Sequence, residues 1–96
     1  MDPYVLLLFL PETDCATLFQ HDKAQGYGDS LSVRDGERKT GAWDDIVSAV
    51  KVERGCALTV YKSRNFVGKS ITWRSTQDYV GKKFNDQIKS WECQCN

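Results

Sequence analysis

Apolar and polar residues alternate in short runs along this chain of 96 residues, and helical periodicity is hard to find. Alternation with a period of two, bounded by glycines and polar clusters, is typical of β-strands. The runs of this kind predict strands over residues 4–10, 16–20, 30–33, 46–52, 57–62, 70–74 and 88–93. Many short strands at such spacing predict an all-β sandwich or barrel.

Turn-forming residues separate the expected strands. The clearest turns are Gly26-Tyr27-Gly28, Asp35-Gly36, Arg54-Gly55 and Gly68, since glycine and aspartate favour the backbone conformations that turns require. Residues 40–45 and 78–86 are less regular, and each could hold a short helical turn. The length of the chain predicts one domain.

The chain contains an internal duplication. Residues 43–50 (WDDIVSAV) return as residues 84–91 (FNDQIKSW), at a spacing of 41 residues. Residues 28–33 match residues 68–73 at a spacing of 40, and residues 17–19 match residues 59–61 at a spacing of 42. A first hairpin loop two residues longer than the second would explain this drift, so both halves follow the same order of elements.

Each copy of the duplicated segment gathers oxygen donors into a short arc. An aromatic residue precedes two acid or amide residues, two spacers follow, and a hydroxyl residue lies three residues after the second acid in the first copy and four residues after it in the second. Oxygen donors are the ligands that a hard cation such as Ca²⁺ requires. The copies differ at one position, where Ser48 of the first copy is replaced by Lys89 in the second.

The second half of the chain resembles a Greek key motif of the βγ-crystallins. The resemblance rests on Tyr61-x4-Phe66-x-Gly68-x-Ser70, followed about fifteen residues later by Asn85-Asp86. It implies a folded hairpin with no room for a side chain at the glycine, an aromatic packed against that hairpin, and a serine hydroxyl that ties the hairpin to the backbone.

Residues 19–30 resemble a first motif with an expanded hairpin. The resemblance therefore implies one βγ-crystallin-like domain, a sandwich of two Greek key motifs over residues 15–55 and 56–96. Residues 1–14 lie outside it as an N-terminal extension that carries an extra apolar strand.

Members of this family bind Ca²⁺ through the pattern Asn/Asp–Asn/Asp–x–x–Ser/Thr–Ser, and the two motifs exchange ligands. Carried onto this chain, the resemblance implies a first site with the Ile46 carbonyl, the Ser48 hydroxyl and the Asp86 carboxylate. A hairpin carbonyl near Gln20 should complete it. Its low ligand charge implies micromolar or weaker affinity. Ala49 departs from the last serine of the pattern, a structural position rather than a ligand.

The symmetric second site is degenerate. It would combine the Asp45 carboxylate, the Gln87 carbonyl and a hairpin carbonyl near Lys62, but Lys89 stands where a hydroxyl belongs. Ca²⁺ and an ammonium about 4 Å apart repel by roughly 8 kcal/mol at an effective dielectric constant of about 20. We therefore expect Lys89 either to swing outward or to place its ammonium at the cation position as a built-in substitute.

The apolar run over residues 4–10 is too short to span a bilayer, which takes about 20 residues. Asp2 and the acidic residues after Pro11 argue against a signal peptide, which slightly favours a cytoplasmic over a secreted location. Three interpretations stay open: a strand that covers a sheet edge, a strand that contacts a second copy or another protein, or a displaced strand of the first motif.

Four cysteines, Cys15, Cys56, Cys93 and Cys95, allow three disulfide pairings. Cys93 and Cys95 are two residues apart, so on a strand they would point to the same face and could both meet partners there. Zinc sites usually show two C-x2-C-like pairs, and this chain has one C-x-C and two isolated cysteines. Free thiols, disulfides and a metal site remain alternatives.

Charge and composition exclude other functions. Thirteen basic residues balance thirteen acidic ones, without the basic excess typical of nucleic-acid-binding proteins. The single histidine, His21, is expected to be exposed in a hairpin and has no recognisable catalytic setting, so no enzyme is expected. Trp73 and Trp91 are expected in the core, with sugar stacking on an exposed tryptophan as the alternative.

The sequence therefore predicts a non-enzymatic Ca²⁺-binding domain in which the cation stabilises the fold. The alternative is a structural, protein-interaction or toxin-like module of the same fold with vestigial calcium sites.

Overall fold

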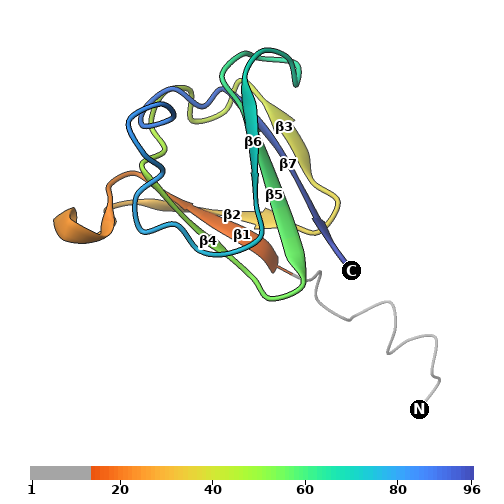
Figure 1. Ribbon diagram of the computed structural model, residues 1–96, viewed down its shortest axis with the longest axis horizontal. Coiled ribbons are helices and arrows are strands. Elements are labelled where there is room, and N and C mark those ends of the chain that lie inside the picture. Colours follow the sequence, from red (N-terminus) through yellow and green to blue (C-terminus); the bar gives the residue numbers. More distant parts are fainter. Residues whose placement is uncertain (1–13) are drawn as a thin grey trace.

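The computed structural model describes residues 14–96, which form two antiparallel β-sheets with the core between them (Figure 1). The predicted all-β sandwich is confirmed. The strand expected over residues 4–10 lies outside the described residues. Within them, no helix is long and apolar enough to cross a membrane.

The first sheet has three strands in the order β2-β1-β4: β1 (Asp14–Phe19), β2 (Ser30–Arg34) and β4 (Ala49–Val52). Leu18 of β1 lies opposite Leu31 of β2 on one side and Val50 of β4 on the other. This register brings apolar side chains together on the sheet face that meets the core, because side chains two residues apart share a face.

The second sheet has four strands in the order β3-β7-β5-β6: β3 (Arg38–Thr40), β5 (Cys56–Tyr61), β6 (Ser70–Trp73) and β7 (Ser90–Cys95). Strand β5 alternates buried and partly exposed residues along its whole length. The alternation that predicted this strand is thus the alternation between core and surface.

Each half of the chain contributes a segment to the sheet of the other half. Strand β3 follows β2 in sequence, but it pairs with β7 in the second sheet. In return, Gln77 from the second half forms a bridge with Val50 of β4, with hydrogen bonds of 2.8 and 3.0 Å. The two halves therefore cannot separate without breaking both sheets.

Side chains from both sheets fill the core. Its largest fully buried members are Trp91, Leu18, Leu58 and Ile88. Trp73 is also buried, and its ring packs edge-on against Phe84 with centroids 6.1 Å apart. The expectation that Trp73 and Trp91 are core aromatics is confirmed.

Several strand boundaries differ from those predicted. Residues 46–48 form a turn and its exit rather than the start of β4, and the last strand runs two residues further than expected, to Cys95. The longer first hairpin contains a 3₁₀ turn, η1 (Lys23–Gln25), whose N-cap Asp22 accepts a hydrogen bond from the Gln25 backbone. Strand β3 was not predicted, because all of its residues are polar and exposed.

The four cysteines form two disulfides. Cys15 of β1 is bonded to Cys93 of β7, which links the two sheets, and Cys56 of β5 is bonded to Cys95 of β7 within the second sheet. Because Cys93 and Cys95 are two residues apart on one strand, both can be bonded at the same end of the sandwich.

Candidate metal-binding site

The two duplicated arcs, residues 43–50 and 84–91, hydrogen-bond to each other with two-fold symmetry. The backbone N–H of Asp86 donates to the Val47 carbonyl at 3.1 Å, and that of Asp45 donates to the Ile88 carbonyl at 3.0 Å. Both aspartates have a left-handed backbone, with φ of 61° at Asp45 and 56° at Asp86. Aspartate and asparagine tolerate this conformation better than most residues, which favours an acid or amide at these positions.

The residue at the hydroxyl position of each arc is held by the hairpin of its own half. The Ser48 N–H donates to the Phe19 carbonyl at 2.9 Å, and the Lys89 N–H donates to the Tyr61 carbonyl at 3.0 Å. The backbone is therefore equivalent at the two sites. Only the side chains distinguish them.

At the first site, Ser48 and Asp86 meet across the two arcs. The Ser48 hydroxyl donates to Oδ1 of Asp86 at 3.2 Å, and Ser48 is only 7% exposed. Within residues 14–96, no basic side chain forms an ion pair with Asp86. Among these residues, the partner observed for the Asp86 carboxylate is therefore a hydroxyl rather than a basic side chain.

A hollow of about 220 Å³ adjoins this pair. It is lined by Gln20, His21, Asp45, Ile46 and Asp86. Two residues that the sequence assigned to the first site, Ile46 and the hairpin residue Gln20, thus lie beside Asp86. His21 was expected to be exposed and without a role, but it is half-buried. Its position next to Gln20 in the chain was the only signal that it would line the site.

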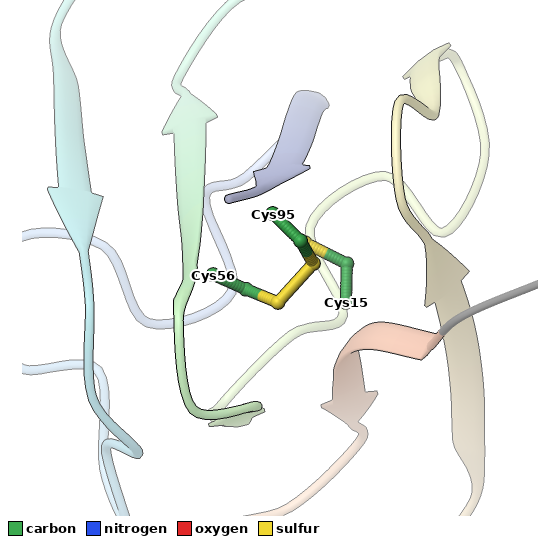
Figure 2. Close-up of side chains that lie close together, drawn as sticks. All are labelled: Cys15, Cys56 and Cys95. Atoms are coloured by element: carbon green, nitrogen blue, oxygen red, sulfur yellow. A yellow bond between two sulfur atoms is a disulfide. The ribbon is translucent and has the colours of Figure 1, made fainter.

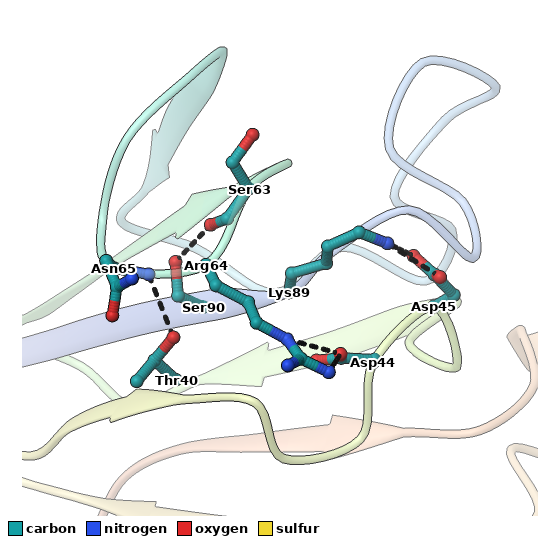
Figure 3. Close-up of polar contacts among 8 residues, drawn as sticks. All are labelled: Thr40, Asp44, Asp45, Ser63, Arg64, Asn65, Lys89 and Ser90. Atoms are coloured by element: carbon teal, nitrogen blue, oxygen red, sulfur yellow. Dashed lines mark hydrogen bonds and ion pairs between the residues drawn. The ribbon is translucent and has the colours of Figure 1, made fainter.

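At the second site, the Lys89 ammonium forms an ion pair with the Asp45 carboxylate. Its ammonium Nζ lies 2.6 Å from Oδ1 and 2.7 Å from Oδ2 of Asp45, so it contacts both carboxylate oxygens (Figure 3). The Lys89 side chain is therefore turned toward Asp45, and its role as a built-in substitute for the cation stays a prediction. Gln87, the expected carbonyl ligand, is exposed, and the Lys62 ammonium lies 5.1 Å above the Phe84 ring.

The first member of each acidic pair is turned inward. Oδ1 of Asp44 and Oδ1 of Asn85 are buried and have no hydrogen-bond partner in the described part of the chain. The other oxygen of Asp44 accepts hydrogen bonds from the Arg64 guanidinium, whose Nε lies 2.9 Å away (Figure 3). Both acids of the first arc are therefore paired with basic residues of the second half.

The two folded hairpins pack as the resemblance implied at their glycines. Gly28 and Gly68 have φ of 68° and 82°, and an added Cβ would lie 2.6 Å from the His21 ring and 2.7 Å from the Ser63 hydroxyl, respectively. The aromatic of the second hairpin also packs as expected, since the Tyr61 and Phe66 rings meet edge to face with centroids 5.9 Å apart.

The serine that ties the second hairpin is not the expected one. Ser70 starts β6 and is exposed, whereas the buried hydroxyl of Ser90 donates to the Ser63 carbonyl at 2.6 Å (Figure 3). The same hydroxyl accepts a hydrogen bond from the Phe66 N–H at 3.1 Å. The equivalent residue of the first arc is Ala49, which has no hydroxyl. The signal for this role was the last serine of the Asn/Asp–Asn/Asp–x–x–Ser/Thr–Ser pattern, which is Ser90 in the second arc.

Known structures match this fold over most of the chain. A βγ-crystallin domain from Flavobacterium johnsoniae is 21% identical with a TM-score of 0.79, and the match covers 86% of this chain and 97% of that one. A βγ-crystallin domain from Clostridium beijerinckii is 26% identical with a TM-score of 0.74, covering 83% and 97%. The N-terminal domain of Protein S is 22% identical with a TM-score of 0.74, covering 84% and 96%. No family model and no curated protein matches the chain by sequence.

The βγ-crystallin resemblance is thereby confirmed at the level of the fold. Residues 14–96 share the architecture of these βγ-crystallin domains, two antiparallel sheets packed around one core.

Proposed function

We propose that this domain binds one Ca²⁺ at the first site and that the cation stabilises the fold. The observation that carries the proposal is the cross-arc pair of Ser48 and Asp86, in which a carboxylate that has no basic partner among residues 14–96 faces a hydroxyl. The Ile46 carbonyl and a hairpin carbonyl near Gln20 would add neutral oxygens from residues that line the same hollow.

The spacing of the donor oxygens suits this cation. Two oxygens that each lie about 2.4 Å from one Ca²⁺, at right angles, are about 3.4 Å apart. The Ser48 and Asp86 oxygens are separated by 3.2 Å, so they could coordinate one ion with little rearrangement. With a single carboxylate the ligand charge is low, which supports a dissociation constant in the micromolar range or above.

The second site would not bind Ca²⁺ under this proposal. Lys89 already neutralises Asp45, and an ammonium beside the ion would oppose binding more strongly than one missing ligand. The same ion pair favours a second candidate function, a protein-interaction module in which both calcium sites are vestigial. Such a module would fold without Ca²⁺ and show no change in stability when it is added.

Calorimetric titration and thermal melting with Ca²⁺ distinguish these functions. We expect one equivalent of Ca²⁺ to bind, and a concentration 100-fold above the dissociation constant to add about 2.7 kcal/mol of stability. Ser48→Ala and Asp86→Ala should remove most of this gain. Asp29→Ala, at an exposed hairpin aspartate, is the matched control and should keep it. Unchanged melting with no binding heat would leave the interaction module as the function.

A further inference from the structure

Four cysteines from three strands converge at one end of the sandwich. Cys15 lies near the start of β1, Cys56 begins β5, and Cys93 and Cys95 lie on β7. Figure 2 shows the sulfurs of Cys15, Cys56 and Cys95 gathered between these strands. We propose that, when both disulfides are reduced, these cysteines form a structural Zn²⁺ site that is independent of the proposed calcium site.

The sulfur positions are close to those of a thiolate zinc site. The Sγ atoms of Cys15, Cys56 and Cys95 all lie within 4.8 Å of one another. Tetrahedral zinc with Zn–S bonds of about 2.3 Å places neighbouring sulfurs about 3.8 Å apart. Side-chain torsions can supply shifts of this size once the disulfides are open. The fourth sulfur, of Cys93, is bonded to that of Cys15 and so adjoins the group.

Burial makes this a closed site rather than an open catalytic one. Cys15, Cys56 and Cys93 are between 0% and 4% exposed, and Cys95 is partly exposed. A structural zinc site has four protein ligands, whereas a catalytic site keeps one position for water or substrate. A reductant and the metal would enter from the side of the cluster where Cys95 is partly exposed.

The chemistry balances with a dithiol as the reductant. Each protein disulfide accepts two electrons and two protons from one dithiol, which closes to a cyclic disulfide. Zn²⁺ then replaces the four thiol protons, which are released to solvent, because the thiolate is the metal ligand. The positive charge of the ion permits the buried thiols to ionise.

Sequence spacing could not indicate this site, because its ligands are brought together by sheet register. Cys56 lies directly opposite Cys95 in the β5–β7 pairing, and Cys15 comes from the other sheet. In either redox state, the same four residues would cross-link β1 of the first sheet with β5 and β7 of the second. The domain would then keep this cross-link in both oxidising and reducing surroundings.

Titration with Co²⁺, a spectroscopic substitute for Zn²⁺, tests the proposal. The full chain is reduced with a dithiol, desalted without oxygen and titrated, with the oxidised chain as a parallel sample. We expect one equivalent to give the intense visible absorption of tetrahedral Co²⁺ and thiolate-to-cobalt charge transfer, both abolished by Zn²⁺. The oxidised chain should give neither. The near-ultraviolet circular dichroism of the buried Trp91 should persist in the complex, as expected for a folded site.

Variants identify the ligands. Cys56→Ser and Cys93→Ser, studied in the reduced state, should each weaken Co²⁺ binding more than about 100-fold, beyond the 10–100-fold effect typical of an outer-shell partner. His21→Ala removes the only histidine and should leave binding unchanged. The proposal is overturned if tetrahedral absorption is absent at one equivalent, if the complex lacks the tryptophan signal because an unfolded chain holds the metal, or if Cys56→Ser retains full affinity.

Discussion

Replacing Lys89 with serine should open the second calcium site. In the absence of Ca²⁺ the variant loses the ion pair with Asp45, whose side chain is 49% exposed against 35% for Lys89. Pairs at this exposure contribute about 0.2–1 kcal/mol. For a domain of this size, 1 kcal/mol corresponds to about 4–8 °C, so the metal-free variant should melt about 1–8 °C below the parent.

In the presence of Ca²⁺, the Lys89→Ser variant should instead be more stable than the parent. The substitution removes an ammonium that opposes the ion by about 8 kcal/mol at 4 Å and an effective dielectric constant of about 20, and it restores a hydroxyl. With a dissociation constant of about 10⁻⁴ M, 10 mM Ca²⁺ adds about 2.7 kcal/mol for each site. Lys89→Ser, with two sites, should therefore become more stable than the parent by about 2 kcal/mol.

Calorimetry gives the stoichiometry and melting curves give the stability. Lys89→Met is the matched control, because it removes the charge without supplying an oxygen; it should lose the ion pair and bind the second ion weakly or not at all. A Lys89→Ser variant that binds no more calcium than the parent would refute the assignment of this arc as a blocked site. Equal gains in the serine and methionine variants would refute the ligand role of the hydroxyl.

Three further predictions concern the hairpins and the outer face of the second sheet. Gly68→Ala should lower the free energy of unfolding, measured in urea, by about 1–3 kcal/mol, because the φ of Gly68 is +82° and an added Cβ would meet a hairpin side chain. The control is Gly55→Ala, where φ is +80° but the space is open, and its free energy of unfolding should fall by only about 1–2 kcal/mol. Ser90→Ala should lose about 1–3 kcal/mol in the same assay, because it takes the hydroxyl partner away from the Ser63 carbonyl and the Phe66 N–H, two partly buried hairpin groups. The pKa of Tyr61 is raised, first by the hydrogen bond from its hydroxyl to Glu92 and then, to a smaller extent, by burial and by the charge of Glu92. The stability from this neutral hydroxyl is present below about pH 10 and is lost as the pH rises through the raised pKa. Since the pKa of Tyr27 is raised as well, by burial and by Asp78, ultraviolet titration should show late phenolate formation that Tyr61→Phe reduces by one tyrosine. An unchanged late phase in Tyr61→Phe would contradict this.

Local patterning was sufficient for the strands that face the core. In β5 every second residue from Cys56 to Val60 is buried, and that alternation is visible in the sequence. Strand β3 has no such pattern, because its three residues are exposed and are held by pairing with Glu92, Trp91 and Ser90 of the last strand. A strand defined by a partner about 50 residues away leaves no local signal.

The sequence predicted that Ser48 and Asp86 meet at the candidate first site, but not the direction in which Lys89 points at the second. The duplication and the family resemblance paired Ser48 with Asp86, which lie 38 residues apart in sequence. They could not decide whether Lys89 points outward or toward Asp45, because that choice depends on the distance between two side chains of different arcs. The disulfide pairing was undecided for the same reason. It follows from the register that places Cys56 opposite Cys95.

The exchange of β3 into the second sheet has a consequence for biosynthesis. The hydrogen-bonded partner of β3 is β7, the last strand in sequence. At a translation rate of about 5–20 residues per second, β3 emerges from the ribosome several seconds before β7 exists. An unpaired strand edge is prone to wrong association during such an interval; in β3, the two adjacent cations Arg38 and Lys39 oppose it. The first half of the nascent chain therefore cannot complete its sheet pairing until β7 has been synthesised and can pair with β3.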